Sequence, residues 1–165
     1  MQITVHPLNL ARKEHFRARR NGFRHTHAVQ ILDAEELHEA GQWPVVAPHS
    51  LRLVFEDLPD GPEHYQIPAD YRGPSVGDME KLIAFGRSLP ADARVYLHCF
   101  AGVSRSPAAA LIIQAARGVT DASALRFTDR NAYPNVVMLA MADRLLGSGG
   151  RLQQIGAALS FHSES

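Results

Sequence analysis

The only cysteine of the chain, Cys99, lies six positions before Arg105 in the sequence HCFAGVSRS of residues 98–106. A cysteine thiolate is a strong nucleophile, and an arginine guanidinium can grip two oxygens of a phosphoryl group with its planar fork of donors. A short loop separates the two side chains, so they can face the same bound anion. The spacing therefore predicts a site at which sulfur attacks a phosphoryl group.

The loop between these two residues is predicted to bind phosphate through its backbone. Gly102 permits a positive φ angle or a close approach to a ligand, and converging amides beside a helix N-terminus form an anion site. The same electropositive surroundings favour the thiolate form of a cysteine. The residues expected to surround the phosphate are Phe100, Ala101, Gly102, Val103, Ser104 and Arg105.

Two polar residues flank this loop. Ser106 can donate a hydrogen bond to the sulfur when sulfur is the leaving group of a second step. His98 is expected to fix the loop backbone or to support the thiolate rather than to transfer protons. A lone cysteine is usually a buried structural residue, but that role would leave the histidine, the glycine, the arginine and the serine unexplained.

The loop is expected to join a strand to a helix. Residues Arg94–His98 are β-branched and aromatic, which favours a strand. Pro107 lacks an N–H group and suits the first turn of a helix, and Gly118 can end that helix after Arg117. The cysteine then lies at the end of a strand and the arginine near a helix N-terminus.

Strands and helices are predicted to alternate along the chain. Further strands are expected at residues 1–5, 27–32 and 51–55. Helices are expected after a capping box at Ser75 and Asp78, from 121 to 128, and from an N-cap at Asn135 to Gly147. This alternation predicts an α/β fold with a central, mostly parallel twisted sheet of four to five strands flanked by helices.

The motif at residues 98–106 resembles the signature of the cysteine-dependent protein-tyrosine phosphatase superfamily, in which His-Cys is followed by five residues, Arg, and Ser or Thr. The run Ala-Gly-Val-Ser-Arg-Ser is similar to the compact dual-specificity phosphatases and their bacterial tyrosine phosphatase relatives. A second element, Arg130-Asn-Ala-Tyr-Pro134-Asn135, looks like the family's downstream Arg-x-x-x-Pro-Asn. In the family this asparagine supports the phosphate loop, a role that the resemblance assigns to Asn135.

The resemblance implies one phosphatase domain over residues 1–165 with a protein-tyrosine-phosphatase-like fold. The implied reaction is a two-step hydrolysis of a phosphomonoester through a phosphocysteine intermediate, with Cys99, Arg105 and Ser106 in the catalytic machinery. It needs no cofactor and no metal. The implied substrate is phosphotyrosine in proteins, together with phosphoserine and phosphothreonine if the enzyme has dual specificity, or a small phosphomonoester; the product is inorganic phosphate.

An aspartic acid protonates the leaving oxygen in the family and lies just after a strand upstream of the cysteine. Asp57 follows the predicted strand at 51–55 and is the first choice. Asp60 and Asp70 lie in the same long loop and remain alternatives. Each of the three could instead cap a turn, which is the commoner use of aspartate in loops.

The composition fits one ordinary globular domain of 165 residues, with 45% hydrophobic and 21% charged residues. The net charge of zero gives no indication of a nucleic-acid partner. Six Arg or Lys residues lie between Arg12 and Arg24, where they could attract acidic substrates or simply be solvated. No signal peptide and no membrane span is apparent, and a single cysteine excludes an internal disulfide, so a cytoplasmic location is expected.

Several other functions fit the sequence less well. A phosphoinositide or other non-protein phosphatase is an alternative, although phosphoinositide phosphatases often carry lysines in this loop and none is present here. A phosphate-binding pseudophosphatase usually lacks the cysteine, the arginine or the acid. Sulfur transfer does not require an arginine followed by serine at these positions, and arsenate reduction normally needs further cysteines. The nine histidines show no metal-binding spacing.

Overall fold

The computed structural model of the chain describes residues 1–165 except 41, 59–71, 123–124, 128–131 and 162–165. The strands within these described residues are β1 (Gln2–Pro7), β2 (His27–Leu32), β3 (His49–Val54), β4 (Arg94–Cys99) and β5 (Leu125–Phe127). The helices are α1 (Leu8–Asn21), α2 (Ala34–Ala40), α3 (Val76–Ser88), α4 (Arg105–Ala116), α5 (Val136–Leu146) and α6 (Arg151–Phe161).

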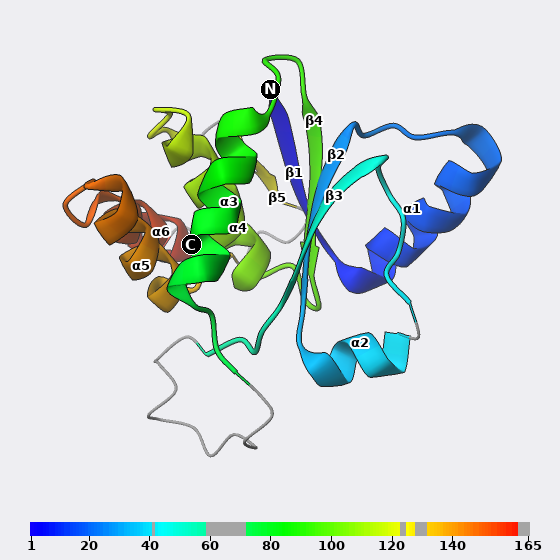
Figure 1. Cartoon of the computed structure of the whole chain (residues 1–165), viewed down its shortest axis with the longest axis horizontal. Helices are drawn as coiled ribbons and strands as arrows, with labels where there is room; N and C mark the ends of the chain where they lie inside the picture. Colours follow the sequence, from blue (N-terminus) through cyan, green and yellow to red (C-terminus); the bar gives the residue numbers. More distant parts are fainter. Residues whose placement is uncertain (41, 59–71, 123–124, 128–131, 162–165) are drawn as a thin grey trace.

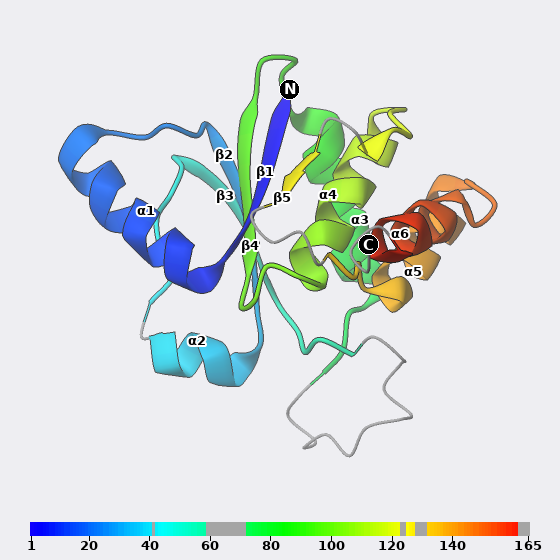
Figure 2. The ribbon, with the colours of Figure 1, turned by 180° about the vertical axis from the view of Figure 1, so that it is seen from behind.

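The five strands form one parallel sheet in the order β3-β2-β4-β1-β5. Figures 1 and 2 show helices α1 and α2 on one face of this sheet and α3, α4, α5 and α6 on the other. The molecule is thus a three-layer α/β structure. Because the strands are parallel, the loops that follow β1, β2, β3 and β4 meet at one edge of the sheet, where ligands bind in open α/β sheets.

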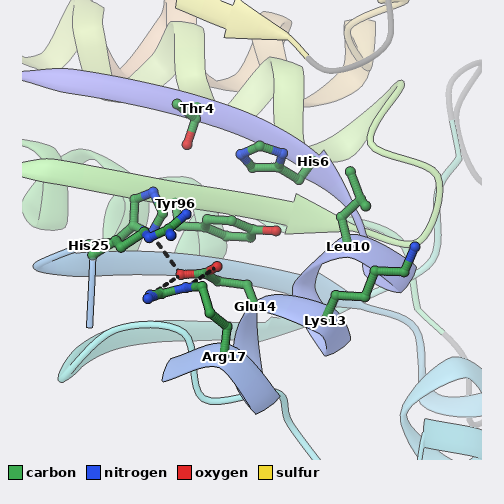
Figure 3. A pocket seen from close by; sticks show the side chains of 9 residues that line it. Thr4, His6, Leu10, Lys13, Glu14, Arg17, His25 and Tyr96 are labelled. Atoms are coloured by element: carbon green, nitrogen blue, oxygen red, sulfur yellow. Dashed lines mark hydrogen bonds and ion pairs between the residues drawn. The ribbon is translucent and has the colours of Figure 1, made fainter. Parts of the chain in front are cut away.

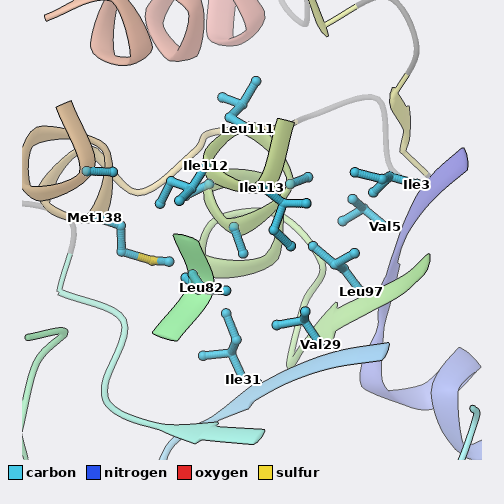
Figure 4. Close-up of a cluster of buried hydrophobic side chains, with 14 of the residues drawn as sticks. Ile3, Val5, Val29, Ile31, Leu82, Leu97, Leu111, Ile112, Ile113 and Met138 are labelled. Carbon is cyan, nitrogen blue, oxygen red and sulfur yellow. The ribbon is translucent and has the colours of Figure 1, made fainter. Parts of the chain in front are cut away.

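The helix α4 lies at the centre of the larger helical layer. Each residue from Arg105 to Gln114 is buried, as expected for a helix that is apolar around most of its circumference. Gly86 of α3 permits a close approach, since a Cβ atom at that position would lie 3.1 Å from the backbone of Ile113. Figure 4 shows the apolar core between this helix and the sheet, which includes Ile3, Val5, Val29, Ile31, Leu82, Leu97, Leu111, Ile112, Ile113 and Met138. The residue that begins α4, Arg105, is therefore held on a firmly packed support.

The structure confirms the α/β class and most of the predicted elements. The strand predicted at residues 27–32 has those bounds, and the other three predicted strands differ only near their ends. The capping box of Ser75 and Asp78 is present at the start of α3. Asn135 caps α5, and Gly147 ends it with a positive φ of 64°.

The helix predicted at residues 121–128 is wrong within the described residues of that segment. Leu125–Phe127 form strand β5, which pairs in parallel with Ile3–Val5. Pairing with the open edge of the sheet outweighs the local helical pattern, because intrinsic propensity is weaker than tertiary contacts. Three helices were not predicted: α1, which carries most of the basic segment between Arg12 and Arg24, α2 and α6.

Candidate active site

The loop from Cys99 to Arg105 lies against the junction of β1 and α1. Gly102 has a φ of 76°, and a Cβ atom there would lie 2.7 Å from the backbone carbonyl carbon of His6. The carbonyl oxygen of Phe100 accepts a hydrogen bond from the amide of Leu8 at 2.8 Å. Both the backbone angle and the lack of space require glycine at position 102, which explains the conformational role predicted for it.

The other side of the loop is held by the segment that leads into α5. The carbonyl oxygen of Val103 accepts from the amide of Tyr133 at 2.9 Å, and that of Ser104 accepts from the amide of Asn135 at 3.2 Å. The Asn135 side chain caps α5 by accepting from the amide of Met138 at 3.0 Å. Asn135 thus contacts the loop directly, at the position where the resemblance places a supporting asparagine.

The thiol of Cys99 is buried and lies among hydrogen-bond donors. Its Sγ atom is 3.2 Å from the Oγ atom of Ser106, and the amide of Gly102 donates to it at 3.3 Å. The side chain is only 2% exposed within the structure. The Gly102 amide thus donates to the sulfur, and the Ser106 hydroxyl is close enough to donate to it as well.

Arg105 is also buried, at 3% exposure, and its guanidinium is held in a fixed orientation. Its Nη1 atom donates to the carbonyl oxygen of Phe55 at 2.9 Å, and its Nη2 atom donates to both carboxylate oxygens of Glu36 at 3.2 and 3.1 Å. Burial lowers the pKa of Arg105, but the charges of Cys99, Glu36, Asp57 and Asp33 together outweigh burial and raise it. The buried Nε–H has no hydrogen-bond partner among the described residues.

Asp57 lies beside both the loop and the arginine. Its Oδ1 atom accepts hydrogen bonds from the Oγ atom of Ser104 at 2.7 Å and from the Nδ2 atom of Asn135 at 2.8 Å. Its Oδ2 atom is 3.9 Å from the Nε atom of Arg105. Because β3 ends at the same sheet edge as β4, a residue that is far from Cys99 in sequence reaches the loop from Cys99 to Arg105.

These side chains line a cavity of about 420 Å³. Its wall includes Cys99, Phe100, Ala101, Val103, Ser104 and Arg105, together with four carboxyl groups from Asp33, Glu36, Glu56 and Asp57. Burial raises the pKa of Glu56, and nearby Asp33 adds to this; burial likewise raises the pKa of Glu36. The cavity therefore combines a nucleophile, a cation and carboxyl groups that can carry protons.

Comparisons with protein-family models, curated proteins and solved structures give no match. The geometry of the cavity is therefore the basis for assigning a function. Within the described ranges, no helix is both long and apolar enough for a membrane span. The same ranges hold no group of three or more histidine, cysteine, aspartate or glutamate side chains placed to bind a metal ion.

The structure brings together most of the site residues that the sequence singled out, with His98 as the exception. Cys99, Asp57, Ser106, Asn135 and the loop through Arg105 form one connected cluster. The two alternative acids, Asp60 and Asp70, lie outside the described residues, and so does Arg130 of the second motif.

Sequence reasoning missed Asp33, Glu36 and Glu56. Asp33 and Glu36 form a reciprocal capping box at the start of α2: the amide of Glu36 donates to Asp33 at 2.7 Å and the amide of Asp33 donates to Glu36 at 2.9 Å. The spacing Asp-x-x-Glu after the strand at 27–32 was the available signal for this helix start. No local pattern indicated that Glu36 would reach Arg105.

His98 points away from the thiol and into a buried network on the opposite face of the sheet. The amide nitrogen of Gln30 donates to the Nε2 atom of His98 at 3.0 Å, while the Oε1 atom of Gln30 accepts from Arg52 at 3.1 Å. The Gln30 amide nitrogen can only donate, so His98 accepts and is neutral. Burial lowers its pKa to about 4. His98 thus anchors the end of β4 and does not contact the reacting sulfur.

The neutral state of His98 predicts a loss of stability in mild acid. The unfolded chain protonates this histidine below its ordinary pKa of 6.5, whereas the folded protein does so only below about 4. Its contribution is present above pH 6.5 and is lost as the pH falls towards 4. Between about pH 7.5 and about pH 5, this single group should remove about 2 kcal/mol of unfolding free energy.

Urea unfolding of the wild type and of His98→Gln at the two pH values measures this effect. The decrease in unfolding free energy should be smaller in the variant by about 2 kcal/mol. The matched control His38→Gln removes an exposed histidine of α2. An equal pH dependence in wild type and His98→Gln would show that His98 does not resist protonation.

Proposed function

We propose that this chain is a phosphomonoester hydrolase of the protein-tyrosine phosphatase type that acts on phosphotyrosine in proteins, and on phosphoserine and phosphothreonine if its specificity is dual. Cys99 is the nucleophile, Arg105 and the loop amides bind the phosphoryl group, Asp57 is the general acid and base, and Ser106 stabilises the sulfur. His98 and Asn135 position the loop. A working thiolate requires reducing surroundings, so the proposed location is the cytoplasm.

The observation that carries this proposal is the unsatisfied Nε–H of Arg105. Buried polar groups nearly always have a hydrogen-bond partner, and an exception calls for an explanation. This donor belongs to a rigidly held guanidinium that lines the same cavity as the Cys99 thiol. An oxygen of a bound phosphoryl group is the acceptor that would complete the arrangement.

In the first step, the Cys99 thiolate attacks phosphorus and a sulfur–phosphorus bond forms while the bond to the leaving oxygen breaks. Asp57 gives its proton to that oxygen. The guanidinium and the loop amides stabilise the charge on the three equatorial oxygens. The product of this step is a phosphocysteine and a free alcohol or phenol.

In the second step, Asp57 takes a proton from a water molecule, which attacks phosphorus. The sulfur–phosphorus bond breaks, inorganic phosphate is released and the Cys99 thiolate returns. The hydroxyl of Ser106 lies 3.2 Å from the sulfur, so it can donate to the charge that develops there. Without such a donor, sulfur would be a poorer leaving group.

The charge around the cavity supports a protein substrate over a phosphoinositide. Four carboxyl groups and one guanidinium line the cavity, so a headgroup with several phosphates would face like charges at close range. A phosphotyrosine carries one phosphate on an apolar ring. A cavity of about 420 Å³ is within the range of small-ligand sites.

Hydrolysis of p-nitrophenyl phosphate tests the proposed function. We expect turnover on the order of 1 s⁻¹ or faster, unchanged by a chelator and inhibited by vanadate in competition with substrate. Faster hydrolysis of a phosphoinositide than of phosphotyrosine peptides would contradict the substrate class. Binding of phosphate without any turnover would instead identify a pseudophosphatase.

A further inference from the structure

The face of the sheet beneath α1 is unusually polar. Residues of β1 and β4 that point to the opposite face are apolar core residues such as Val5 and Leu97, whereas His6 and Tyr96 face α1. The ring of His6 stacks on that of Tyr96 at a centroid distance of 4.3 Å. His25 meets the same tyrosine edge-on at 4.9 Å. A covered sheet face is ordinarily apolar; here Tyr96 packs with Ala11, Ala28, Val46 and Ala47, and the rings of the two histidines contact it.

A cavity of about 490 Å³ lies between these rings and the part of α1 that carries Leu10, Lys13, Glu14 and Arg17. Beside it, Tyr96 packs directly against α1 at Ala11. Figure 3 shows that the side chains lining the cavity come from β1, β4, α1 and the segment before β2. This volume is in the range of sites for small organic ligands. We call this cavity, between the rings of His6, His25 and Tyr96 and the basic face of α1, the α1 cavity.

The cavity wall carries an excess of positive charge. Lys13, Arg17 and Arg24 line it, and Glu14 is the carboxylate that opposes them. Arg17 is already bound to Glu14, through hydrogen bonds of 2.8 and 2.6 Å. Among the described residues, Lys13 and Arg24 make no side-chain hydrogen bond or close ion pair, although the charge of Arg24 helps to lower the pKa of Glu14. Two cations therefore remain available at the edge of a ring-lined cavity.

The two histidines do not add further charge. Burial lowers the pKa of His6 to about 4, and burial also lowers that of His25 although Glu14 opposes the change. Both imidazoles are therefore neutral near pH 7 and act as flat surfaces. The buried Nδ1 atom of His25 has no hydrogen-bond partner among the described residues and lies 3.7 Å from a carboxylate oxygen of Glu14. This atom is itself buried, so the groups that face the cavity are the histidine rings and the cations.

We propose that the α1 cavity is a second ligand site, which binds a small aromatic anion with its charged groups at Lys13 and Arg24 and its ring against the half-buried rings of His6 and His25. The site is separate from the cavity that holds Cys99, and the two share no lining residue. It does not depend on the proposed phosphatase activity. A bare inorganic anion lacks the ring that this surface would contact.

Naphthalene-1,5-disulfonate tests the proposal because it has a flat ring and two negative charges but no phosphoester bond. We expect saturable binding at millimolar concentration or below. Calorimetry measures the affinity, and changes in the amide chemical shifts of α1 and of the segment before β2 locate the site. The variant Lys13→Gln/Arg24→Gln should weaken binding at least about tenfold, since each lost cation removes a charge-assisted contact. Sulfate, which has no ring, should bind at least about tenfold more weakly than the probe.

The control variant Arg19→Gln/Arg20→Gln removes the same charge from exposed positions of α1 that do not line the cavity. It should leave the affinity for the disulfonate unchanged at constant ionic strength. Equal weakening in the two double variants would mean general attraction to a basic helix and would overturn the site. Absence of binding, or shifts confined to the Cys99 loop, would overturn it as well. Equal affinity for sulfate would refute the aromatic part of the proposal. Because the readout is binding, these outcomes are independent of whether p-nitrophenyl phosphate is hydrolysed.

Discussion

Replacing Cys99 with serine should lower the turnover of p-nitrophenyl phosphate by a factor on the order of 10⁴ to 10⁶. Binding of inorganic phosphate should persist. A serine hydroxyl is not ionised near neutral pH and is a far weaker nucleophile than a thiolate. The smaller oxygen fits the space of the sulfur, and the donors at Ser106 and Gly102 still have an acceptor. The phosphate-binding parts of the loop and Arg105 remain unchanged.

Initial rates measure the loss of turnover, and calorimetric titration with inorganic phosphate measures binding. Thermal unfolding of the variant checks that the fold is kept. A Cys99→Ser enzyme that retains turnover would exclude sulfur as the nucleophile. Loss of both turnover and phosphate binding with the fold intact would mean that the thiol, rather than the loop and Arg105, provides the anion site.

Replacing Asp57 with asparagine should lower turnover in a manner that depends on the leaving group. Phenyl phosphate, whose leaving oxygen needs a proton, should react roughly 10² to 10⁴ times more slowly. p-Nitrophenyl phosphate, whose phenolate leaves readily, should be affected much less. The amide oxygen of asparagine can still accept from Ser104 and Asn135, so the loop keeps these contacts. The substitution removes the transferable proton and the carboxylate charge that lies 3.9 Å from the Nε atom of Arg105.

The comparison of kcat for the two esters in wild type and variant measures this dependence. Asp92→Asn, at an exposed position in the turn before β4, is the matched control and should leave both rates unchanged. The same test applied to Glu56→Gln, Asp60→Asn and Asp70→Asn distinguishes the other candidate acids. Glu56 is included because it lines the cavity and burial raises its pKa. If one of these variants, and not Asp57→Asn, loses more kcat with phenyl phosphate than with p-nitrophenyl phosphate, the general acid is that residue and not Asp57.

The nucleophile loop could be predicted because its information is local. A strand, a glycine with a positive φ, an arginine and a helix start follow one another within a few residues. The cap at Asn135 and the capping box at Ser75 are equally local signals, and both are present. Asp57 was expected from the family resemblance, which places an acid just after a strand upstream of the cysteine. The parallel sheet explains why this residue can reach the loop, because β3 and β4 end at the same edge.

The surroundings of Arg105 could not be predicted in this way. Its partners Phe55 and Glu36 come from two other elements, and their approach depends on how α2 and the end of β3 pack against the sheet. The helix prediction that included Leu125–Phe127 was wrong for the same reason. The conformation of this segment is decided by pairing with β1, which is distant in sequence. The contact between His6 and Tyr96 likewise depends on the register of β1 against β4, two strands that are far apart in sequence.

The central position of β1 has a consequence for the order in which the active loop can assemble. Among the strands of this sheet β1 comes first in the sequence, yet its two neighbours are the fourth and the fifth, and Pro7 pairs with Cys99 about ninety residues later. Contacts of such long sequence separation require a large loop to close and slow the folding of a chain. In a nascent chain that ends before β4, β1 has neither of its neighbours. The backbone of His6 and Pro7, against which Gly102 packs, is therefore not yet held in place. Activity recovered during refolding would report the completion of the whole sheet rather than of a local motif.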